Sequence, residues 1–309
     1  MKRDLLSFDS LSTHDIDALI AQAMELKKKQ KAGIGHQLLT GKTLGMLFEK
    51  PSTRTRVSFE VGMVQLGGHA LYMSSRDTQL SREESPEDTA RVLSRYLDGI
   101  VIRTFSQDTL EIYARYATIP VINGLTDLLH PCQILSDLMT VAEKKGDYRH
   151  LTIAYVGDGN NVANSWIDAA LKIGFRLHLA CPQGYEPDGK ILARARAEAP
   201  ARIRLYADPF AAVQGADIVN TDTWISMGQE ESHEERREAF KNYQVNSTLL
   251  AAAQKDVMVM HCLPAHRGEE ITDEVADGKH AIIFDQAENR LHMQKAVLAT
   301  FLTYPPEES

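Results

Sequence analysis

Five consecutive residues, Ser52-Thr53-Arg54-Thr55-Arg56, place hydroxyl and guanidinium groups directly after Pro51. The apolar run at 43–48 predicts a buried strand, and a helix is expected to begin at Ser52. The first turn of a helix has free backbone N–H groups and the positive end of the helix dipole, so it attracts anions. The segment is a candidate anion cradle, although N-capping by Ser52 with two surface arginines explains the same residues equally well.

Other polar side chains stand where later apolar runs end. Arg103 closes the predicted strand 99–103, and His130 and Gln133 lie at the start of a helix predicted over 130–145. An imidazole and an amide at this point can both hydrogen-bond a carbonyl oxygen. A lone histidine is usually structural, so the sequence leaves a structural and a functional role for His130 equally open.

A carboxylate and a thiol follow two further strands. Asp222 comes directly after the run that ends in Ile218-Val219, and its carboxylate can hold an ammonium group. Cys262 follows the apolar strand 257–260, where a cysteine is a core residue by default and a nucleophile or orienting group otherwise. Asn161 and Arg290 stand at the start of two more helices.

The elements that position these residues alternate between strand and helix along the whole chain. The predicted strands are 43–48, 71–73, 99–103, 120–123, 151–156, 176–180, 203–206, 218–219, 257–260 and 281–284. The predicted helices are 12–31, 52–66 (with Val57, Val61 and Val64 on one side), 89–96, 110–116, 130–145, 162–173 and 287–301, and 79–88 is expected to be an exposed loop. This pattern predicts an α/β fold of two doubly wound domains, each with a central parallel sheet flanked by helices. Ligands of such sheets bind at the carboxyl ends of the strands, where the polar residues described above stand.

Length and composition agree with two globular domains. A chain of 309 residues suggests domains at 1–145 and 150–286, joined by the turn at Gly146-Asp147-Tyr148. The net charge of −8 argues against nucleic acid and against an anionic membrane as partner. No apolar run is long enough for a membrane span, the first residues do not resemble a signal peptide, and three cysteines fit a reducing compartment. We therefore expect a cytoplasmic protein.

Three cofactor motifs are incomplete. Between Gly35 and Thr43 the glycine spacing of a P-loop is wrong, and the segment precedes a strand instead of following one. Gly157-Asp158-Gly159 resembles the start of a dinucleotide site, but Val162 replaces the third glycine and no acidic residue follows at the required distance. The spacing of His261, Cys262 and His266 matches no common zinc site. The charged run 229–238 is interpreted as a solvated helix or loop, with a mobile lid as the alternative.

The order and separation of four motifs resemble the aspartate/ornithine carbamoyltransferase family over essentially the whole chain. These motifs are Ser52-Thr53-Arg54-Thr55-Arg56, His130-Pro131-Cys132-Gln133, Asp222 with Ser226-Met227-Gly228, and His261-Cys262-Leu263-Pro264. The last two are similar to the ornithine branch. The resemblance implies an enzyme that transfers the carbamoyl group of carbamoyl phosphate to the side-chain amine of L-ornithine, giving citrulline and phosphate.

The resemblance also implies roles for individual residues. The phosphoryl group is expected at Ser52, Thr53, Arg54 and Thr55, and the carbamoyl group at Arg103, His130 and Gln133. Gln79 is expected to reach a neighbouring subunit's site. The ornithine head group is expected at Asn161, Asp222, Ser226 and Met227, and the reacting centre at Cys262, Leu263 and Arg290. The catalytic residues among these are Arg103, His130, Cys262 and Arg290, whereas Arg56 is interpreted as structural and paired with a carboxylate.

The family implies an active site between the two domains, a last helix (287–309) that returns to the first domain, trimers, and no metal or organic cofactor. Three alternatives remain. A related transcarbamoylase would use aspartate, N-acetylornithine or putrescine; Asp222 disfavours aspartate, and putrescine is excluded less firmly. A non-catalytic anion-binding protein would lack residues such as Arg54, His130 or Cys262, which are present here. A nicotinamide enzyme is disfavoured by the incomplete glycine motif.

Overall fold

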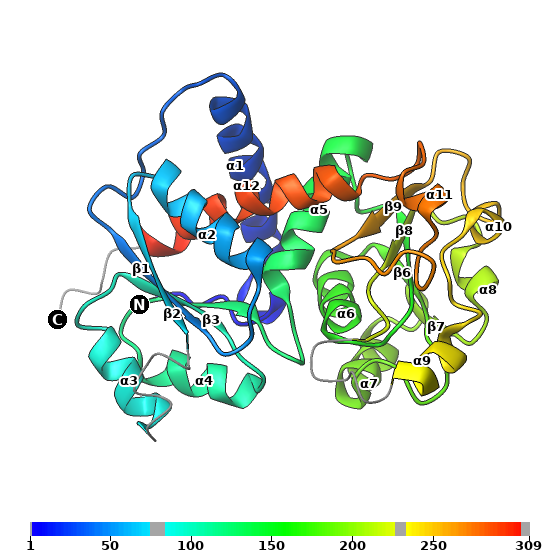
Figure 1. Cartoon of the computed structure of the whole chain (residues 1–309), viewed down its shortest axis with the longest axis horizontal. Helices are drawn as coiled ribbons and strands as arrows, with labels where there is room; N and C mark the ends of the chain where they lie inside the picture. Colours follow the sequence, from blue (N-terminus) through cyan, green and yellow to red (C-terminus); the bar gives the residue numbers. More distant parts are fainter. Residues whose placement is uncertain (1, 75–83, 226–232, 304–309) are drawn as a thin grey trace. The chain divides into compact units, whose positions relative to one another are not determined.

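The computed structural model describes residues 2–74, 84–225 and 233–303, and it divides the chain into two compact units (Figure 1). Unit 1 comprises residues 1–143 and 289–309, and unit 2 comprises residues 144–288. Each unit has a parallel sheet with helices packed against it, so the predicted α/β fold is confirmed. None of the helices in the described ranges is long and apolar enough to span a membrane.

The sheet of unit 1 has four parallel strands in the order β2-β1-β3-β4. They are β1 (Thr43–Phe48), β2 (His69–Ser74), β3 (Gly99–Arg103) and β4 (Val121–Leu125). Because β1 pairs with β2 on one side and with β3 on the other, the strand order reverses at β1. Such a reversal opens a crevice at the carboxyl ends of the two strands. The segment that begins at Ser52 and the side chain of Arg103 both follow these ends.

The helices of unit 1 include α2, which carries the hydroxyl and guanidinium residues in its first turn. The described helices are η1 (Phe8–Ser10), α1 (Thr13–Lys31), α2 (Thr53–Gln65), α3 (Pro86–Leu93), α4 (Gln107–Tyr116), α5 (Pro131–Lys145) and α12 (Ile283–Leu302). Unit 1 includes α12 from Asn289 onward. The side chain of Ser12 caps α1 in a capping box with Asp15. A buried cluster that includes Leu47, Ile102 and Tyr113 forms part of the core.

The sheet of unit 2 has five parallel strands in the order β7-β6-β5-β8-β9. They are β5 (Thr152–Val156), β6 (Arg176–Ala180), β7 (Ile203–Tyr206), β8 (Ile218–Thr221) and β9 (Met258–His261). The helices are α6 (Asn161–Ile173), α7 (Gly189–Glu198), α8 (Pro209–Val213), α9 (His233–Phe240), α10 (Ser247–Leu250) and α11 (Asp273–Ala276). Here the order reverses at β5, which pairs with β6 and β8. Asp222 and Cys262 follow β8 and the neighbouring β9.

Two element predictions were wrong. Residues 281–284 form no strand: Ala281 makes a single bridge to Val259, and α12 begins at Ile283. The apolar residues there serve the first turn of a helix instead. The part of the predicted loop 79–88 that the structure describes is not all loop, because Ser85 caps α3, which begins at Pro86. Residues 79–83 lie outside the described ranges.

Gly159, in the incomplete dinucleotide motif, has a packing role. A Cβ atom at this position would overlap the backbone of Glu186 and Pro187. The backbone N–H of Gly159 also donates to the carbonyl oxygen of Tyr185, at 2.8 Å. Only glycine therefore allows the segment after β5 to lie against 185–187 without displacing the backbone.

We expect Gly159→Ala to lower the free energy of unfolding by about 1–3 kcal/mol, because backbone atoms must move to admit the methyl group. Gly189→Ala is the matched control: no atom lies within 4 Å of its added Cβ and the position is helical, so stability should stay unchanged or rise slightly. Urea denaturation of the two variants measures the difference. Equal stability of the two variants would contradict this packing role.

Candidate active site

The first turn of α2 combines a helix cap with polar groups available to a ligand. Ser52 is the N-cap, its Oγ accepts from the backbone N–H of Thr55 at 3.3 Å, and it donates to Thr55 Oγ1 at 3.1 Å. Arg54 is half-buried, and its buried Nε has no hydrogen-bond partner among the described residues. Thr53 is exposed. Capping by Ser52 and anion binding are therefore compatible, because the cap uses only one hydroxyl group.

Three cationic or imidazole side chains from other elements accompany this turn in unit 1. Arg290 of α12 is buried and donates from Nη2 to Thr55 Oγ1 at 2.7 Å. Arg103, at the end of β3, is buried and donates from Nε to the carbonyl oxygen of Lys50 at 3.2 Å. His130, directly before α5, is also buried. Helix starts and strand ends that are distant in sequence thus supply one cluster.

Electrostatics keep His130 neutral. Burial lowers its pKa well below the usual value of 6.5, and the positive charges of Arg290 and Arg103 lower it further. A neutral imidazole can still donate one hydrogen bond to a carbonyl oxygen, whereas it holds no proton to give as an acid at neutral pH. Gln133 lies one turn into α5, fully buried, and its Nε2 donates to Asp137 Oδ1 at 2.8 Å.

The carboxylates carried by the adjoining strand ends are engaged elsewhere. Glu49 accepts a hydrogen bond from Thr104, and Asp127 pairs with Lys50. Arg56 pairs with Glu60 at 3.0 Å and lies over the ring of Tyr72, so the predicted pairing with a carboxylate is confirmed. The buried guanidinium groups of Arg103 and Arg290 contact Lys50 and Thr55 beside the start of α2, where positive charge suits an anion.

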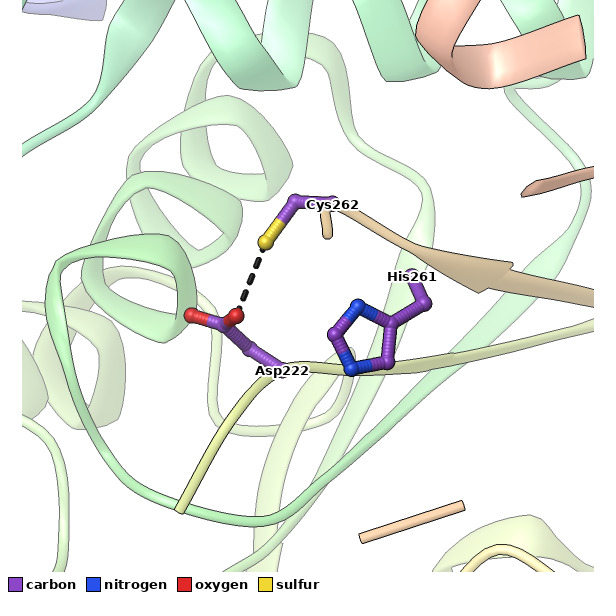
Figure 2. A group of neighbouring side chains, drawn as sticks. All are labelled: Asp222, His261 and Cys262. Carbon is purple, nitrogen blue, oxygen red and sulfur yellow. Dashed lines mark hydrogen bonds between the residues drawn. The ribbon is translucent and has the colours of Figure 1, made fainter. Parts of the chain in front are cut away.

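In unit 2 a carboxylate and a thiol meet at the strand ends. Figure 2 shows the Cys262 thiol directed at Asp222, where Sγ lies 2.8 Å from Oδ1. Oδ1 also accepts from the backbone N–H of Thr223 at 2.8 Å, and Oδ2 accepts from Asn160 Nδ2 at 2.8 Å. Asp222 is buried and Cys262 is half-buried. The carboxylate is thus held in one orientation by three donors.

Asn160 is a residue that the sequence reasoning missed. It caps α6 through its Oδ1, which accepts from the backbone N–H of Val162, while its amide nitrogen holds Asp222. The predicted residue, Asn161, is the next in the chain, and its side chain is half-buried. The signal was present in the sequence, because Asn160 is the better N-cap position after a strand and a glycine turn.

A buried histidine shapes the loop that carries Cys262. His261 Nε2 lies 3.0 Å from Glu270 Oε1, and its Nδ1 accepts from the backbone N–H of Leu263 at 2.9 Å. The carboxylate of Glu270 fixes the tautomer with the proton on Nε2. Leu263 has a backbone φ of 60°, which residues other than glycine rarely adopt, so this hydrogen-bond network helps to hold the backbone in that conformation.

Two groups in the described ranges have metal-ligand atoms close together. They are Asp222, His261 and Cys262, and His266, Glu269 and Glu270, with the ligand atoms of each group within 4.8 Å of one another. Both ring nitrogens of His261 are hydrogen-bonded, and the thiol of Cys262 donates to Asp222. Hydrogen bonding therefore accounts for the positions of His261 and Cys262 in the first group.

Within the charged run 229–238, residues 229–232 lie outside the described ranges, and the described residues are not simply solvated. Arg236 of α9 is buried, its Nη2 lies 2.7 Å from Asp158 Oδ2, and it stacks over the rings of Tyr185 and Phe240. Burial raises the pKa of Asp158 to about 6 despite this ion pair. Arg236 thus links α9 to the strand end at β5. Gln79, Ser226 and Met227 lie outside the described ranges.

These observations define an α/β protein with buried guanidinium groups at a helix start in one unit and a carboxylate–thiol pair in the other. Residues 3–143 match the family model "Aspartate/ornithine carbamoyltransferase, carbamoyl-P binding domain", and residues 149–301 match the "Asp/Orn binding domain". The chain therefore belongs to the aspartate/ornithine carbamoyltransferase family, which confirms the resemblance seen in the motifs.

Known relatives are similar over nearly the whole chain. The ornithine carbamoyltransferase of Syntrophus aciditrophicus is 60% identical over 298 residues, covering 96% of this chain and 99% of that protein. That of Desulfotalea psychrophila is 57% identical over 302 residues, covering 98% and 100%. The solved structure of ornithine carbamoyltransferase from Pyrococcus furiosus is 53% identical, with a TM-score of 0.92 and 96% of each chain covered.

The lowered pKa of His130 has a measurable consequence for stability. The unfolded chain takes up a proton at His130 as the pH falls through about 6.5, whereas the folded protein does not, so acid favours unfolding. From about pH 7.5 to about pH 5.5, the wild type should lose about 1 kcal/mol of unfolding free energy relative to His130→Asn. Urea denaturation at the two pH values measures this, and an identical pH dependence of both proteins would show that His130 titrates normally when folded.

Proposed function

We propose that this chain transfers the carbamoyl group of carbamoyl phosphate to the side-chain amine of L-ornithine and releases L-citrulline and phosphate. The observation that carries the proposal is the buried positive cluster of Arg103 and Arg290 at the start of α2, which suits a phosphate ester. Family membership and relatives named ornithine carbamoyltransferase support it over most of the chain.

In this proposal, unit 1 is the carbamoyl-phosphate domain. The phosphoryl oxygens accept hydrogen bonds from the first turn of α2 and from Ser52, Thr53, Arg54 and Thr55. The half-buried Arg54, whose Nε has no partner among the described residues, supplies a guanidinium group for this purpose. Gln79, from a neighbouring subunit, would complete the site.

A second set of side chains is proposed to hydrogen-bond the carbamoyl group. Arg103 and the neutral His130 donate to its carbonyl oxygen, and Gln133 orients its amide end. When the amine attacks, negative charge develops on that oxygen, and donors already in place stabilise it without reorganisation. The low pKa of His130 supports a role as a hydrogen-bond donor and not as a proton donor.

Unit 2 is proposed to hold L-ornithine. The carboxylate of Asp222, fixed by Asn160 and Cys262, suits the α-ammonium group of the amino acid. Asn161, Ser226 and Met227 belong to the same binding set by family resemblance. Because Asp222 is negative, this unit disfavours the acidic acceptor L-aspartate.

The chemistry requires a neutral side-chain amine. An amine with a pKa near 10.4 costs roughly 4.6 kcal/mol to deprotonate at neutral pH, and a nearby positive charge such as Arg290 reduces that cost. The amine nitrogen then attacks the carbamoyl carbon, the bond to the phosphate oxygen breaks, and the proton lost by the amine passes to phosphate. Cys262 and Leu263 line the reacting centre, where the thiol orients the amine. Carbamoyl phosphate is already activated, so the step needs no nucleotide.

The acceptor is tested by measuring product formation from carbamoyl phosphate with L-ornithine, N-acetylornithine, putrescine and L-aspartate in parallel. We expect product from L-ornithine alone. Product only from putrescine or N-acetylornithine, the alternative acceptors, would keep the phosphate site and overturn the role of Asp222. No product from any acceptor would favour a non-catalytic anion-binding protein.

Arg54→Ala should raise the KM for carbamoyl phosphate by about 100-fold or more, because a charge-assisted pair of hydrogen bonds is lost. Arg56→Ala is the matched control: Arg56 is exposed and paired with Glu60, so its removal should change the KM less than about 3-fold. Steady-state kinetics at saturating L-ornithine give both values. Equal effects of the two substitutions would remove Arg54 from the cradle.

The enzyme is also proposed to assemble as a homotrimer. Val57, Val61 and Val64, on one side of α2 as expected, are exposed, with 70% exposure at Val64, and Leu71 of β2 is exposed as well. The buried residues of α2 are Thr55, Phe59, Gly62 and Met63. A second apolar side on a helix that already packs into its own unit suits contact with another copy of the chain.

Light scattering should give a mass of about 104 kDa, three times the 34.5 kDa of one chain. Val64→Glu should shift the mass toward one chain, because a charge is costly to bury in an apolar interface. Phe284→Gln, which removes an exposed apolar side chain of unit 2, should leave the mass unchanged. A single-chain mass for the wild type would refute the trimer.

The proposed cellular location is the cytoplasm, which the three free cysteines support. Arginine metabolism is the proposed context, because L-ornithine and L-citrulline are the proposed substrate and product.

A further inference from the structure

Lys295 of α12 is a fully buried amine in unit 1 that the proposed chemistry does not use. Its side chain has 0% exposure, and its Nζ donates to Gln30 Oε1 at 2.6 Å, to Gln65 Oε1 at 2.9 Å and to His36 Nε2 at 3.1 Å. His36 Nδ1 lies 3.0 Å from the carbonyl oxygen of Ile34, so Nε2 is the acceptor nitrogen. None of the three partners is a carboxylate, which is unusual for a buried lysine.

The three acceptors come from three different segments. Gln30 is in the last turn of α1, His36 is in the connection from α1 to β1, and Gln65 is the last residue of α2. One amine on α12 therefore donates hydrogen bonds to side chains from three separate segments. An apolar side chain of similar length would fill the same space without the cost of burying an amine, but it would not fix direction.

The same two helices meet again at the candidate site. Arg290 of α12 donates to Thr55 Oγ1 in the first turn of α2, and Lys295 of α12 donates to Gln65 at the other end of α2. Thr55 and Gln65 are ten residues apart, or about 15 Å along a helix. Two directional contacts this far apart fix both the position and the rotation of α2 against α12.

The close approach of the helices is set between these two contacts. A Cβ atom on Gly62 of α2 would lie 3.3 Å from Cγ of Lys295 and 3.7 Å from Cδ1 of Leu298. The aliphatic part of the Lys295 side chain thus packs against the backbone of α2 at Gly62, the single glycine of that helix. The amine and the stem act on the same helix.

We propose that Lys295 is a positioning residue for the anion cradle: through Gln65 it holds α2 in the register that lets Arg290 meet Thr55. This inference rests on the proposed function of the cradle. It makes the far end of α2 part of the determinants of carbamoyl phosphate affinity, although Lys295 itself touches no substrate.

Two matched substitutions separate positioning from general stability. Gln65→Met removes the acceptor on α2, and Gln30→Met removes an equivalent acceptor of the same amine on α1. We expect Gln65→Met to raise the KM for carbamoyl phosphate about 5-fold or more and Gln30→Met to change it less than about 2-fold. The KM for L-ornithine should be unchanged in both variants. Lys295→Met should show the same pattern as Gln65→Met.

Calorimetric titration with inorganic phosphate provides a readout that does not require turnover. Weaker phosphate binding in Gln65→Met than in Gln30→Met supports the proposal even if the wild type proves to carbamoylate a different acceptor. The proposal is overturned if phosphate affinity is equal in the two variants, whether both keep the wild-type affinity or both lose it to the same extent. If the wild type binds phosphate but yields no product, the proposed function is refuted. The phosphate affinities of Gln65→Met and Gln30→Met then still decide whether Lys295 positions the cradle.

Discussion

The burial of like positive charges in unit 1 is the constraint on which the rest of the site depends. Arg103 and Arg290 are both buried, and their charges, together with burial, lower the pKa of His130. Positive charge that is buried beside the start of a helix suits an anion, which is the proposed ligand there. Burial, together with these positive charges, lowers the pKa of His130, which suits the proposed role of the neutral imidazole as a hydrogen-bond donor to a carbonyl oxygen. In the proposed function, the same cluster serves both the affinity for a phosphate ester and the stabilisation of a developing oxyanion.

The fold brings these charges together by using ends of elements. Arg103 ends β3, Thr55 lies in the first turn of α2, and Arg290 comes from α12, 235 residues after Thr55. The unit 2 site is assembled in the same way, because Asp222 follows β8 and Cys262 follows β9. Arg103 and Asp222 follow strands that pair with the strand at which the order of each sheet reverses, and Cys262 follows the next strand, β9. Contacts that fix one helix against another, such as those of Lys295, therefore set the positions of the side chains proposed to bind carbamoyl phosphate.

The fold class and the residues at the strand ends could be predicted from the sequence, because strand–helix alternation and capping are local signals. Ser52 caps α2 as its position indicates. The failures are all tertiary. Residues 281–284 are apolar enough for a strand, yet α12 begins among them at Ile283. The charged run around Arg236 suggests exposure to solvent, and only the folded structure shows that Arg236 pairs with Asp158. The valines of α2 share a side, but composition does not reveal that Phe59 and Met63 turn inward instead.

The most direct test of the buried positive cluster is the effect of inorganic phosphate on unfolding. Because a ligand that binds only the folded state stabilises it, phosphate at about 100 times its Kd should raise the free energy of unfolding by about 2.7 kcal/mol. Chloride at the same ionic strength should have no comparable effect, since it merely screens surface charge. Coincident unfolding curves in phosphate and chloride would contradict the account, because the buried guanidinium groups would then have no preference for a phosphate anion.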